Sequence, residues 1–190
     1  MVEDTQAADA GASTPPSSVE AELRAAFRQH AGGVAIVTGD SGTGPAGLTL
    51  SSVTSVAIDP PAIVFSLATS GGSAKAILDA ETFAVHLLDA ENIELARVFA
   101  TRGTTRFTDP ESWGRLPTGE PYLTDVPSVL RCHVFERRPV GGSTVVIAIV
   151  DEVLTPRPVT KPVAYVDRTF WPLSGAIDGA DGQPRNWPRR

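Results

Sequence analysis

The sequence predicts a mainly β protein with a few short helices, arranged as an antiparallel barrel that is either closed or split. Two observations predict this class. About seven segments have the composition of strands, whereas only two or three short segments have a helical pattern. The strands also follow one another in hairpin-like succession across Gly-rich and Pro-rich turns, which favours antiparallel pairing over a parallel sheet.

The 190 residues are enough for one domain with its own core, and both ends lack hydrophobic periodicity. Residues 1–17 are rich in Ala, Ser, Thr and Pro, and residues 174–190 in Gly, Asp, Pro and Arg. Such segments bury little apolar surface, so we expect a disordered N-terminal tail and a flexible C-terminal tail. The folded domain is then residues 18–173.

The first element of this domain is a helix that opens at Ser17. Ser17 and Glu20 have the spacing of a capping box, and the helix is expected to end near Gly32-Gly33. Its apolar residues share one face, which is composed of Val19, Leu23, Ala26 and Phe27.

Strands account for most of the chain after this helix. The segments with strand composition are residues 34–38, 46–58, 62–68, 82–88, 129–138, 144–154 and 163–171. The segments 129–138 and 144–154 flank Gly141-Gly142 and predict a hairpin. Its second arm is continuously apolar over residues 145–150, which predicts that this strand is covered on both faces.

Two further helices are expected at residues 73–80 and 90–100, the second with Asp89 as its N-cap. After Thr101 about twenty residues show no clear period. A loop of that length inside a compact domain usually carries function or contributes to an interface.

Charge and cysteine content limit the partners. The chain carries 22 acidic and 16 basic residues, a formal charge of −6, which argues against nucleic acid or an anionic membrane as a partner. No apolar run reaches membrane-spanning length, and the N-terminus lacks an export signal. The single cysteine, Cys132, cannot form an internal disulfide, which fits a reducing cytoplasm.

Several motifs that suggest chemistry have simpler structural explanations. Residues 42–47 match G-x-G-x-x-G, but a strand pattern comes next instead of a helix, so a glycine-rich hairpin turn is expected. His30, His86 and His133 lie in separate elements, and Cys132 alternates with apolar residues. We therefore expect all four side chains to be structural.

The most informative stretch is Gly-Leu-Thr-Leu-Ser-Ser-Val-Thr-Ser-Val, residues 47–56, because it places five hydroxyls in a predicted strand. Its apolar alternation changes phase near Ser51-Ser52, as a β-bulge would produce, and a bulge frees backbone amides. Free amides beside small hydroxyls suit a ring edge or a phosphate. An edge strand whose hydroxyls face solvent is the open alternative.

A second candidate is Ala-Thr-Ser-Gly-Gly-Ser-Ala-Lys, residues 68–75, which leads from a buried strand into a helix. A helix N-terminus, small residues and the first-turn Lys75 together favour a bound phosphate. The alternative is that Ser73 is only an N-cap and that Lys75 is solvated.

In this order, the motifs resemble the flavin reductase-like family of the FMN-binding split barrel, over about residues 22–172. The most specific match is Gly47 to Val56 followed by Asp59-Pro60-Pro61. The other matches are residues 27–38 to the opening helix and first strand, residues 70–75 to the phosphate loop, residues 83–88 to the Phe-Ala-Val-Asn-x-Leu strand, and Arg106-Phe107 to the Arg-Phe pair.

The resemblance implies an antiparallel split barrel that binds FMN or FAD, with NADH or NADPH passing a hydride to flavin N5. It also implies a homodimer with flavin at its interface, and a monooxygenase partner that receives reduced flavin. The implied cofactor-binding residues are Thr49, Leu50, Ser51, Ser52 and Val53 at the ring and ribityl chain, Ser66, Leu67 and Ala68 beneath the flavin, Ser73 and Lys75 at the phosphate, and Arg106 and Phe107 near the shared pocket. No side chain needs to act as an acid or base, because the flavin carries the chemistry.

The chain departs from the family pattern at two places on the nicotinamide side. Gly141-Gly142-Ser143 stands where many relatives have Gly-Asp-His, and Tyr165-Val166 stands where they have Tyr-His. Three alternatives therefore stay open. They are a flavin-binding protein without turnover, a split-barrel flavin-dependent oxidoreductase with its own small-molecule substrate, and an interaction protein without a cofactor.

Overall fold

The computed structural model describes residues 17–69 and 71–174. Apart from Ser17 and Ser174, both predicted tails lie outside the described residues and stay predictions. The helices are α1 (Ser18–Gln29), α2 (Gly72–Asp79) and α3 (Ile93–Ala100), the last preceded by a 3-10 turn, η1 (Ala90–Asn92). The strands are β1 (Ala35–Gly39), β2 (Ala46–Leu50), β3 (Thr54–Ile58), β4 (Pro61–Ala68), β5 (Thr82–Leu87), β6 (Trp113–Arg115), β7 (Pro121–Leu123), β8 (Ser128–Val140), β9 (Ser143–Leu154), β10 (Val163–Val166) and β11 (Thr169–Pro172).

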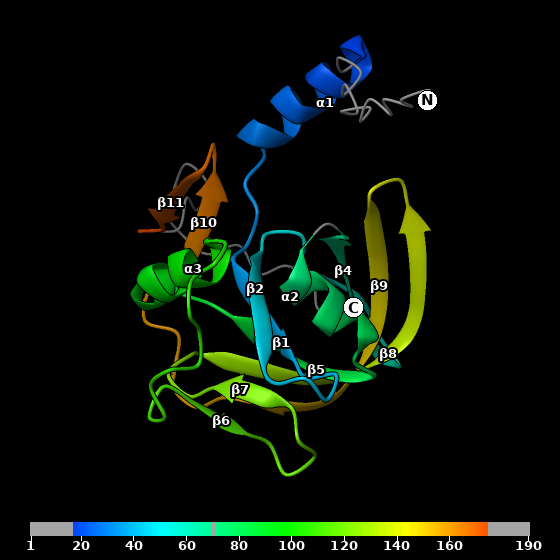
Figure 1. Cartoon of the computed structure of the whole chain (residues 1–190). Coiled ribbons are helices and arrows are strands. Elements are labelled where there is room, and N and C mark those ends of the chain that lie inside the picture. Colours follow the sequence, from blue (N-terminus) through cyan, green and yellow to red (C-terminus); the bar gives the residue numbers. More distant parts are fainter. Residues whose placement is uncertain (1–16, 70, 175–190) are drawn as a thin grey trace, which may run out of the picture.

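Seven strands form one antiparallel sheet in the order β2-β1-β5-β8-β9-β4-β3 (Figure 1). Its two edge strands, β2 and β3, are separated in sequence by residues 51–53 alone. Four Cα–Cα steps reach about 15 Å, whereas the edges of a flat seven-stranded sheet lie about 29 Å apart. The sheet must therefore roll up until its edges approach, yet β2 and β3 are not paired. This is the predicted split barrel.

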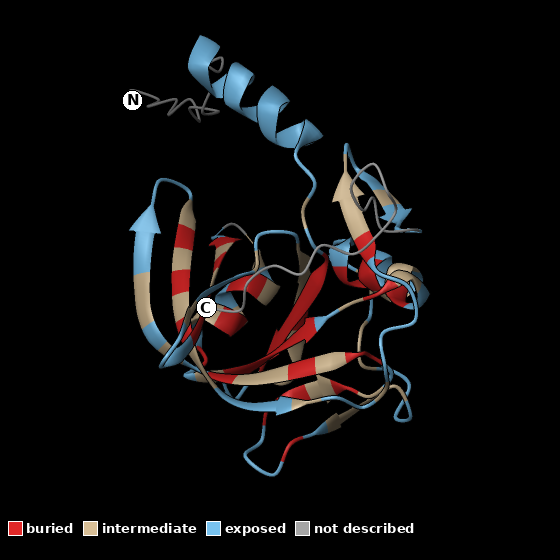
Figure 2. Ribbon diagram, turned by 180° about the vertical axis from the view of Figure 1, so that it is seen from behind, coloured by how far each residue is buried: buried red, intermediate tan, exposed pale blue. Residues whose placement is uncertain are grey.

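The inside of the rolled sheet holds the main apolar core, with Phe65, Phe83 and Ile77 among its fully buried side chains. In Figure 2 the buried residues gather on the central strands and on α2. A second cluster lies under α3 and the β6–β7 hairpin, and a third joins α3 to the β10–β11 hairpin. The barrel thus carries α3 and both small hairpins on its outside.

The structure confirms the predicted start of α1 but leaves its apolar face uncovered. Ser17 and Glu20 form the capping box, and the helix ends at Gln29. Val19, Leu23 and Phe27 are 69%, 57% and 66% exposed. Figures 1 and 2 show why, because α1 extends away from the barrel. The spacing of its apolar residues is typical of a helix packed against a core, but no described element covers the apolar face of α1.

Two predicted single strands are wrong, because each is interrupted. Residues 46–58 form β2 and β3, so the phase change at Ser51-Ser52 marks a complete break rather than a bulge. The register shift of this region lies between Ser55 and Ala57. Likewise residues 163–171 form the β10–β11 hairpin, which turns at Asp167 and Arg168 with positive φ angles of 46° and 61°.

Two further expectations need correction. The stretch after Thr101 contains the short hairpin β6–β7, whose strands are too brief to show a period. In the arm of residues 145–150 only Val146 and Ala148 are buried, whereas the other four residues are half-buried. One face of β9 is thus incompletely covered in the single chain. None of the described helices is long and apolar enough to cross a lipid bilayer.

The structural explanations of the minor motifs hold. The stretch 42–47 forms the β1–β2 turn, where Gly42 and Gly44 adopt positive φ angles of 94° and 111°. His86 and Cys132 are fully buried in the core, while His133 pairs with Asp151 at 2.8 Å. His30 lies directly after the end of α1.

Candidate functional site

The candidate site lies where the barrel is split, along β2 and the link 51–53. Two of the hydroxyls predicted to bind a ligand have partners within the chain. Thr49 Oγ1 donates to the Ala96 carbonyl at 2.7 Å, which ties β2 to α3. Ser52 Oγ accepts from the Ser66 amide at 3.2 Å, which ties the link to β4. These bonds hold the link in place, while its own backbone lies outside the strand ladder.

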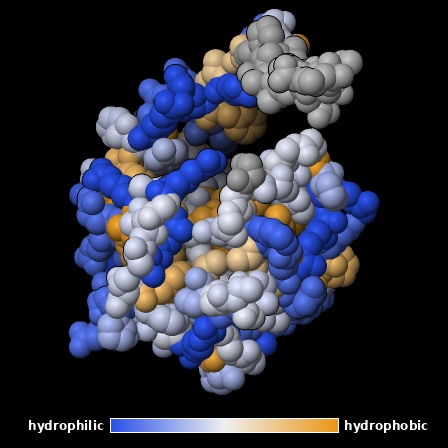
Figure 3. Space-filling model, viewed as in Figure 1, coloured by the Kyte–Doolittle hydropathy of each residue, from blue (hydrophilic) through white to orange (hydrophobic). Residues whose placement is uncertain are grey.

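A cavity of about 750 Å³ opens between β2, the end of β4, the start of α2 and the segment after α3. We call it the α2 cavity. Its size is that of a nucleotide-sized ligand site. Six of the predicted cofactor-binding residues line it, and these are Thr49, Leu50, Leu67, Ala68, Ser73 and Arg106. In Figure 3, which shows this face, hydrophobic side chains near the centre are surrounded by more hydrophilic ones.

One end of the α2 cavity suits an anion. α2 begins at the N-cap Gly71, which provides no side-chain cap, so the amides of its first turn are open to an anionic group. Ser73 is the second residue of α2. The alternative that Ser73 serves only as the N-cap of this helix is therefore wrong. Neither Gly71 nor Gly72 would have a Cβ contact within 4 Å, so this corner is spacious.

Arg106 joins this corner to the end of α3. Its guanidinium donates to the carbonyls of Phe99 and Thr101 at 3.1 and 2.6 Å, and to Ser73 Oγ at 3.0 Å. It therefore caps α3 and brings a positive charge to the first turn of α2. Burial lowers the pKa of this arginine, which nevertheless stays protonated because the pKa of arginine is so high.

The other basic residue predicted at this end, Lys75, does not line the cavity. Its ammonium pairs with Asp79 Oδ2 at 2.5 Å, one helical turn further on, and its side chain is largely exposed. Contact with a phosphate would require the ammonium to leave Asp79. The structure thus brings Arg106, and not Lys75, to the cavity.

A second cavity of about 560 Å³ adjoins the first and shares Thr49 and Leu50 with it. Its far walls are α3, which contributes Arg97, and the β10–β11 hairpin, which contributes Tyr165 and Arg168. We call it the hairpin cavity. It combines aromatic surface with two guanidinium groups, a composition that suits a nucleotide.

The remaining predicted residues lie around these two cavities. Ser51 lines the hairpin cavity, and Ser52 and Val53 line a third cavity beneath α1. Ser66 is half-buried behind Ser52. Phe107 packs edge to face on Phe99 and Trp113, with ring centroids 5.4 and 5.1 Å away, and so supports the site from behind.

Several lining residues were not predicted individually. In the α2 cavity they are Arg102, Thr104 and Thr105, which fall in the long aperiodic segment that was predicted to be functional as a whole. In the hairpin cavity they are Arg97, Arg168 and Phe170. Arg97 falls in the helix predicted at residues 90–100, and no local pattern indicates that a distant hairpin folds over it.

The described structure is thus a split barrel with two adjoining nucleotide-sized cavities at the split. Residues 27–174 match the family model of the flavin reductase like domain. The chain belongs to this family, as its motifs predicted.

Two curated relatives illustrate the family. An NADH:FMN oxidoreductase of Rhodococcus qingshengii is 43% identical over 132 residues, which are 70% of this chain and 69% of the relative. An actinorhodin polyketide dimerase of Streptomyces coelicolor is 33% identical over 165 residues, which are 85% of this chain and 92% of the relative.

Solved structures agree with the fold. A flavin reductase domain protein from Arthrobacter sp. FB24 superposes with a TM-score of 0.79 at 32% identity, over 85% of this chain and 99% of that one. The styrene monooxygenase flavin reductase of Pseudomonas putida S12 has a TM-score of 0.71 at 26% identity, over 82% and 99% of the two chains.

Proposed function

We propose that the protein is an NAD(P)H-dependent flavin reductase that binds FMN or FAD in the α2 cavity. One observation carries the proposal: six cofactor-binding residues predicted from separate stretches of sequence line one cavity of about 750 Å³. The family and the name of the NADH:FMN oxidoreductase support the same activity.

The residues of the α2 cavity fit a flavin. The open first turn of α2 and Arg106 would hold the phosphate. Leu50, Leu67 and Ala68 offer apolar surface to a flat ring. The unladdered link from Ser51 to Val53 follows directly after Leu50, and its residues line the neighbouring cavities. The bound isoalloxazine ring would supply the redox chemistry by accepting a hydride from the reduced nicotinamide. The chain need only bind and align both nucleotides.

The hairpin cavity is the proposed site of NADH or NADPH. It shares Thr49 and Leu50 with the α2 cavity, so ligands of the two cavities would meet at β2. Arg97 and Arg168 provide positive charge for the phosphates of the dinucleotide. Tyr165 lines this cavity. Val166 follows it at the position where the family resemblance places a histidine, so this chain has no imidazole there.

We also propose a homodimer in the cytoplasm that serves a partner monooxygenase. Large apolar side chains stay exposed on β3 and β8, notably Ile58 at 84% and Phe135 at 67%, and β9 is incompletely covered. Surface of this kind usually marks a protein interface. The name of the styrene monooxygenase reductase supports the partner class. Reduced nicotinamide and a lone buried Cys132 fit the cytoplasm.

Steady-state oxidation of NADH and NADPH with added FMN, FAD or riboflavin tests the activity. We expect a protein-dependent rate well above that of flavin alone, together with a change in flavin fluorescence on binding. Flavin binding without such a rate would identify a flavin-binding protein without turnover. The absence of both would leave an interaction protein without a cofactor.

A second candidate function is suggested by the relative that is named a polyketide dimerase. It is a split-barrel flavin enzyme that acts on its own organic substrate. Such a protein would keep its flavin tightly bound through purification, and a small molecule other than free flavin would reoxidise it. Flavin that is lost on gel filtration and replenished from solution would argue for the reductase instead.

A further inference from the structure

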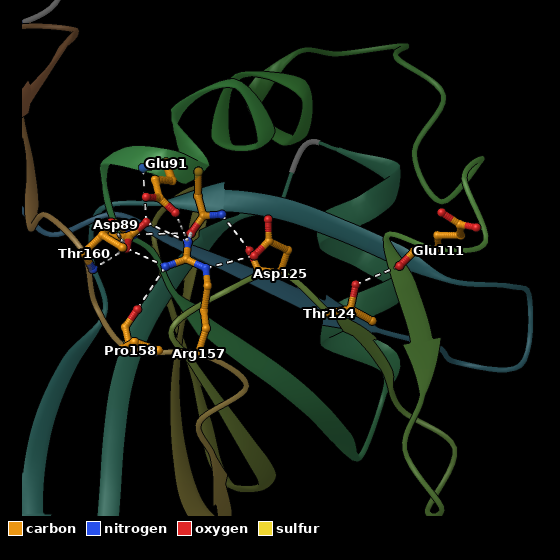
Figure 4. Close-up of polar contacts among 9 residues, drawn as sticks. Asp89, Glu91, Glu111, Thr124, Asp125, Arg157, Pro158 and Thr160 are labelled. Carbon is orange, nitrogen blue, oxygen red and sulfur yellow. Dashed lines mark hydrogen bonds and ion pairs between the residues drawn. The ribbon is translucent and has the colours of Figure 1, made fainter.

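Asp89 is the most heavily bonded carboxylate among the described residues (Figure 4). It lines neither the α2 cavity nor the hairpin cavity. It is the second residue after the end of β5 and is only 1% exposed. Arg157 binds it with two parallel hydrogen bonds, of 2.7 and 2.9 Å. Thr160 adds two more, from its amide and its hydroxyl, both at 3.0 Å. The amide of Glu91 donates a fifth, at 3.1 Å.

Arg157 makes this cluster a junction of three segments. Its guanidinium also binds Asp125 at 2.9 Å and the Asn92 side chain at 3.2 Å. Asn92 in turn donates to the Asp125 carbonyl at 2.7 Å. The start of α3, the loop before β8 and the segment 155–162 are thus joined at one point. We call these contacts of Asp89 and Arg157 the clamp.

The electrostatics keep the clamp closed. Hydrogen bonds from Arg157 hold the pKa of Asp89 far below its usual range, and Asp89 raises the pKa of Arg157. Both groups of the pair are therefore ionised at neutral pH. Bidentate arginine–carboxylate pairs are also more directional than lysine pairs.

The clamp lies between the two far walls of the hairpin cavity. On one side it caps η1, which continues into α3 with Arg97. On the other side it holds the segment that leads into β10, and the Ala90 amide donates to the Lys161 carbonyl at 2.8 Å beside it. The clamp thus connects the helix to the root of the hairpin.

The β10–β11 hairpin depends on such outside support. It is a separate two-stranded sheet, and two strands alone are only marginally stable in water. Besides the clamp, it pairs with Gly32 through Tyr165, at 3.1 and 2.8 Å, and shares a small apolar cluster with α3. In Figures 1 and 2 it lies beside α3, away from the main sheet.

We propose that Asp89 is a positioning residue that, with Arg157, fixes the β10–β11 hairpin against α3 and so sets the shape of the hairpin cavity for the nicotinamide nucleotide. This inference rests on the proposed function of that cavity. Loss of the clamp lets the hairpin move, which weakens nucleotide binding there. The α2 cavity has no hairpin residue in its wall, so flavin binding is spared.

Asp89→Asn tests this inference, because it keeps the size of the side chain and removes its charge. Asp40→Asn is the matched control. Asp40 also accepts from Arg115 at 2.7 Å and from two backbone amides, but it lies in the β1–β2 turn. Replacing Arg157 itself is less informative, because it would leave the buried Asp89 unpaired, which is strongly destabilising.

The first measurement is hydrogen exchange at the paired amides of Gly32 and Tyr165 in the protein without ligands. We expect exchange at least tenfold faster in Asp89→Asn than in the wild type, and unchanged exchange in Asp40→Asn. This readout requires no activity, so it tests the clamp even if the proposed function is wrong. Unchanged exchange in Asp89→Asn would overturn the proposal.

The second measurement is steady-state kinetics with FMN and NADH. We expect Asp89→Asn to raise KM for NADH about tenfold, with kcat and the Kd for FMN within twofold of the wild type. Equal losses in FMN and NADH binding would show general destabilisation and overturn the positioning role. If Asp89→Asn does not fold, Thr160→Val removes a single hydroxyl bond and should shift both readouts in the same direction by a smaller factor.

Discussion

Gly47 shows how a single backbone position supports the site. A Cβ built at Gly47 would lie 2.6 and 2.9 Å from two ring carbons of Phe99. Phe99 is buried, lies beneath Arg106 and packs against Phe107, so it has little room to move. The last glycine of the G-x-G-x-x-G match therefore permits close packing of β2 on α3.

Gly47→Ala should consequently destabilise the protein by about 1–3 kcal/mol through overpacking. Thermal unfolding followed by circular dichroism measures the effect. Gly33→Ala is the control, because nothing lies within 4 Å of a Cβ at Gly33. Equal melting temperatures for Gly47→Ala and the wild type would contradict the close contact.

His86 is a neutral core residue whose tautomer is fixed by its neighbours. The Leu123 amide donates to Nε2 at 3.0 Å, so the ring proton is on Nδ1, which donates to the Ile36 carbonyl at 3.0 Å. Burial lowers the pKa of His86 from 6.5 to about 4. Protonation would add an N–H at Nε2, which would then face the Leu123 amide, itself a donor.

Stability should therefore fall on acidification. The unfolded chain takes up a proton on this histidine below about pH 6.5, whereas the folded chain does so only near pH 4, so the stabilisation is complete above pH 6.5 and decreases between these values. The full effect is on the order of 3 kcal/mol. The variant His86→Asn introduces the residue typical of the family. Its melting temperature should change less between about pH 6.5 and pH 4 than that of the wild type. Identical pH profiles for both proteins would exclude His86 as the cause.

At the scale of elements, the junction of α2 and α3 decides which basic side chain lies at the proposed phosphate end of the α2 cavity. Arg106 reaches both helices, while Lys75 is occupied by Asp79 on the outer side of α2. The sequence had suggested the lysine, because it lies in the first turn of a helix preceded by small residues. Only the fold brings Arg106, 33 residues beyond Ser73, to the same corner.

Arg106→Gln should weaken FMN binding about tenfold or more and riboflavin binding far less, because riboflavin lacks the phosphate. Lys75→Gln should leave both affinities within twofold. Fluorescence titration measures all four dissociation constants. A larger loss of FMN affinity in Lys75→Gln than in Arg106→Gln would show that the lysine leaves Asp79 to bind the phosphate.

At the scale of the whole molecule, the uncovered apolar surface predicts a dimer. Light scattering on the purified protein should give about twice the chain mass of 19.9 kDa. The double variant Ile58→Asp and Phe135→Asp should shift the mass toward the monomer, because each charge would be desolvated in an apolar interface. Val159→Asp is the control, since Val159 is also exposed but belongs to neither strand. A monomeric wild type would refute the proposed homodimer.

Elements of the fold could be predicted wherever the pattern is local. The capping box of α1, the Asp89 cap, the Gly141-Gly142 hairpin and the glycine-rich turn at 42–47 all depend on residues a few positions apart. The break at residues 51–53 and the β10–β11 hairpin were missed. A change of phase is compatible with a bulge or a break, and the choice depends on which distant strand each half pairs with.

The sequence by itself determined the family, the antiparallel barrel and six of the residues that line the α2 cavity, because these depend on composition, periodicity and short motifs. Tertiary structure alone decided that Arg106 reaches the start of α2, that a distant hairpin walls the second cavity, and that Asp89 and Arg157 join it to α3. The physical reason is that such contacts arise when the sheet rolls up. Rolling brings together side chains whose separation along the chain carries no periodic signal.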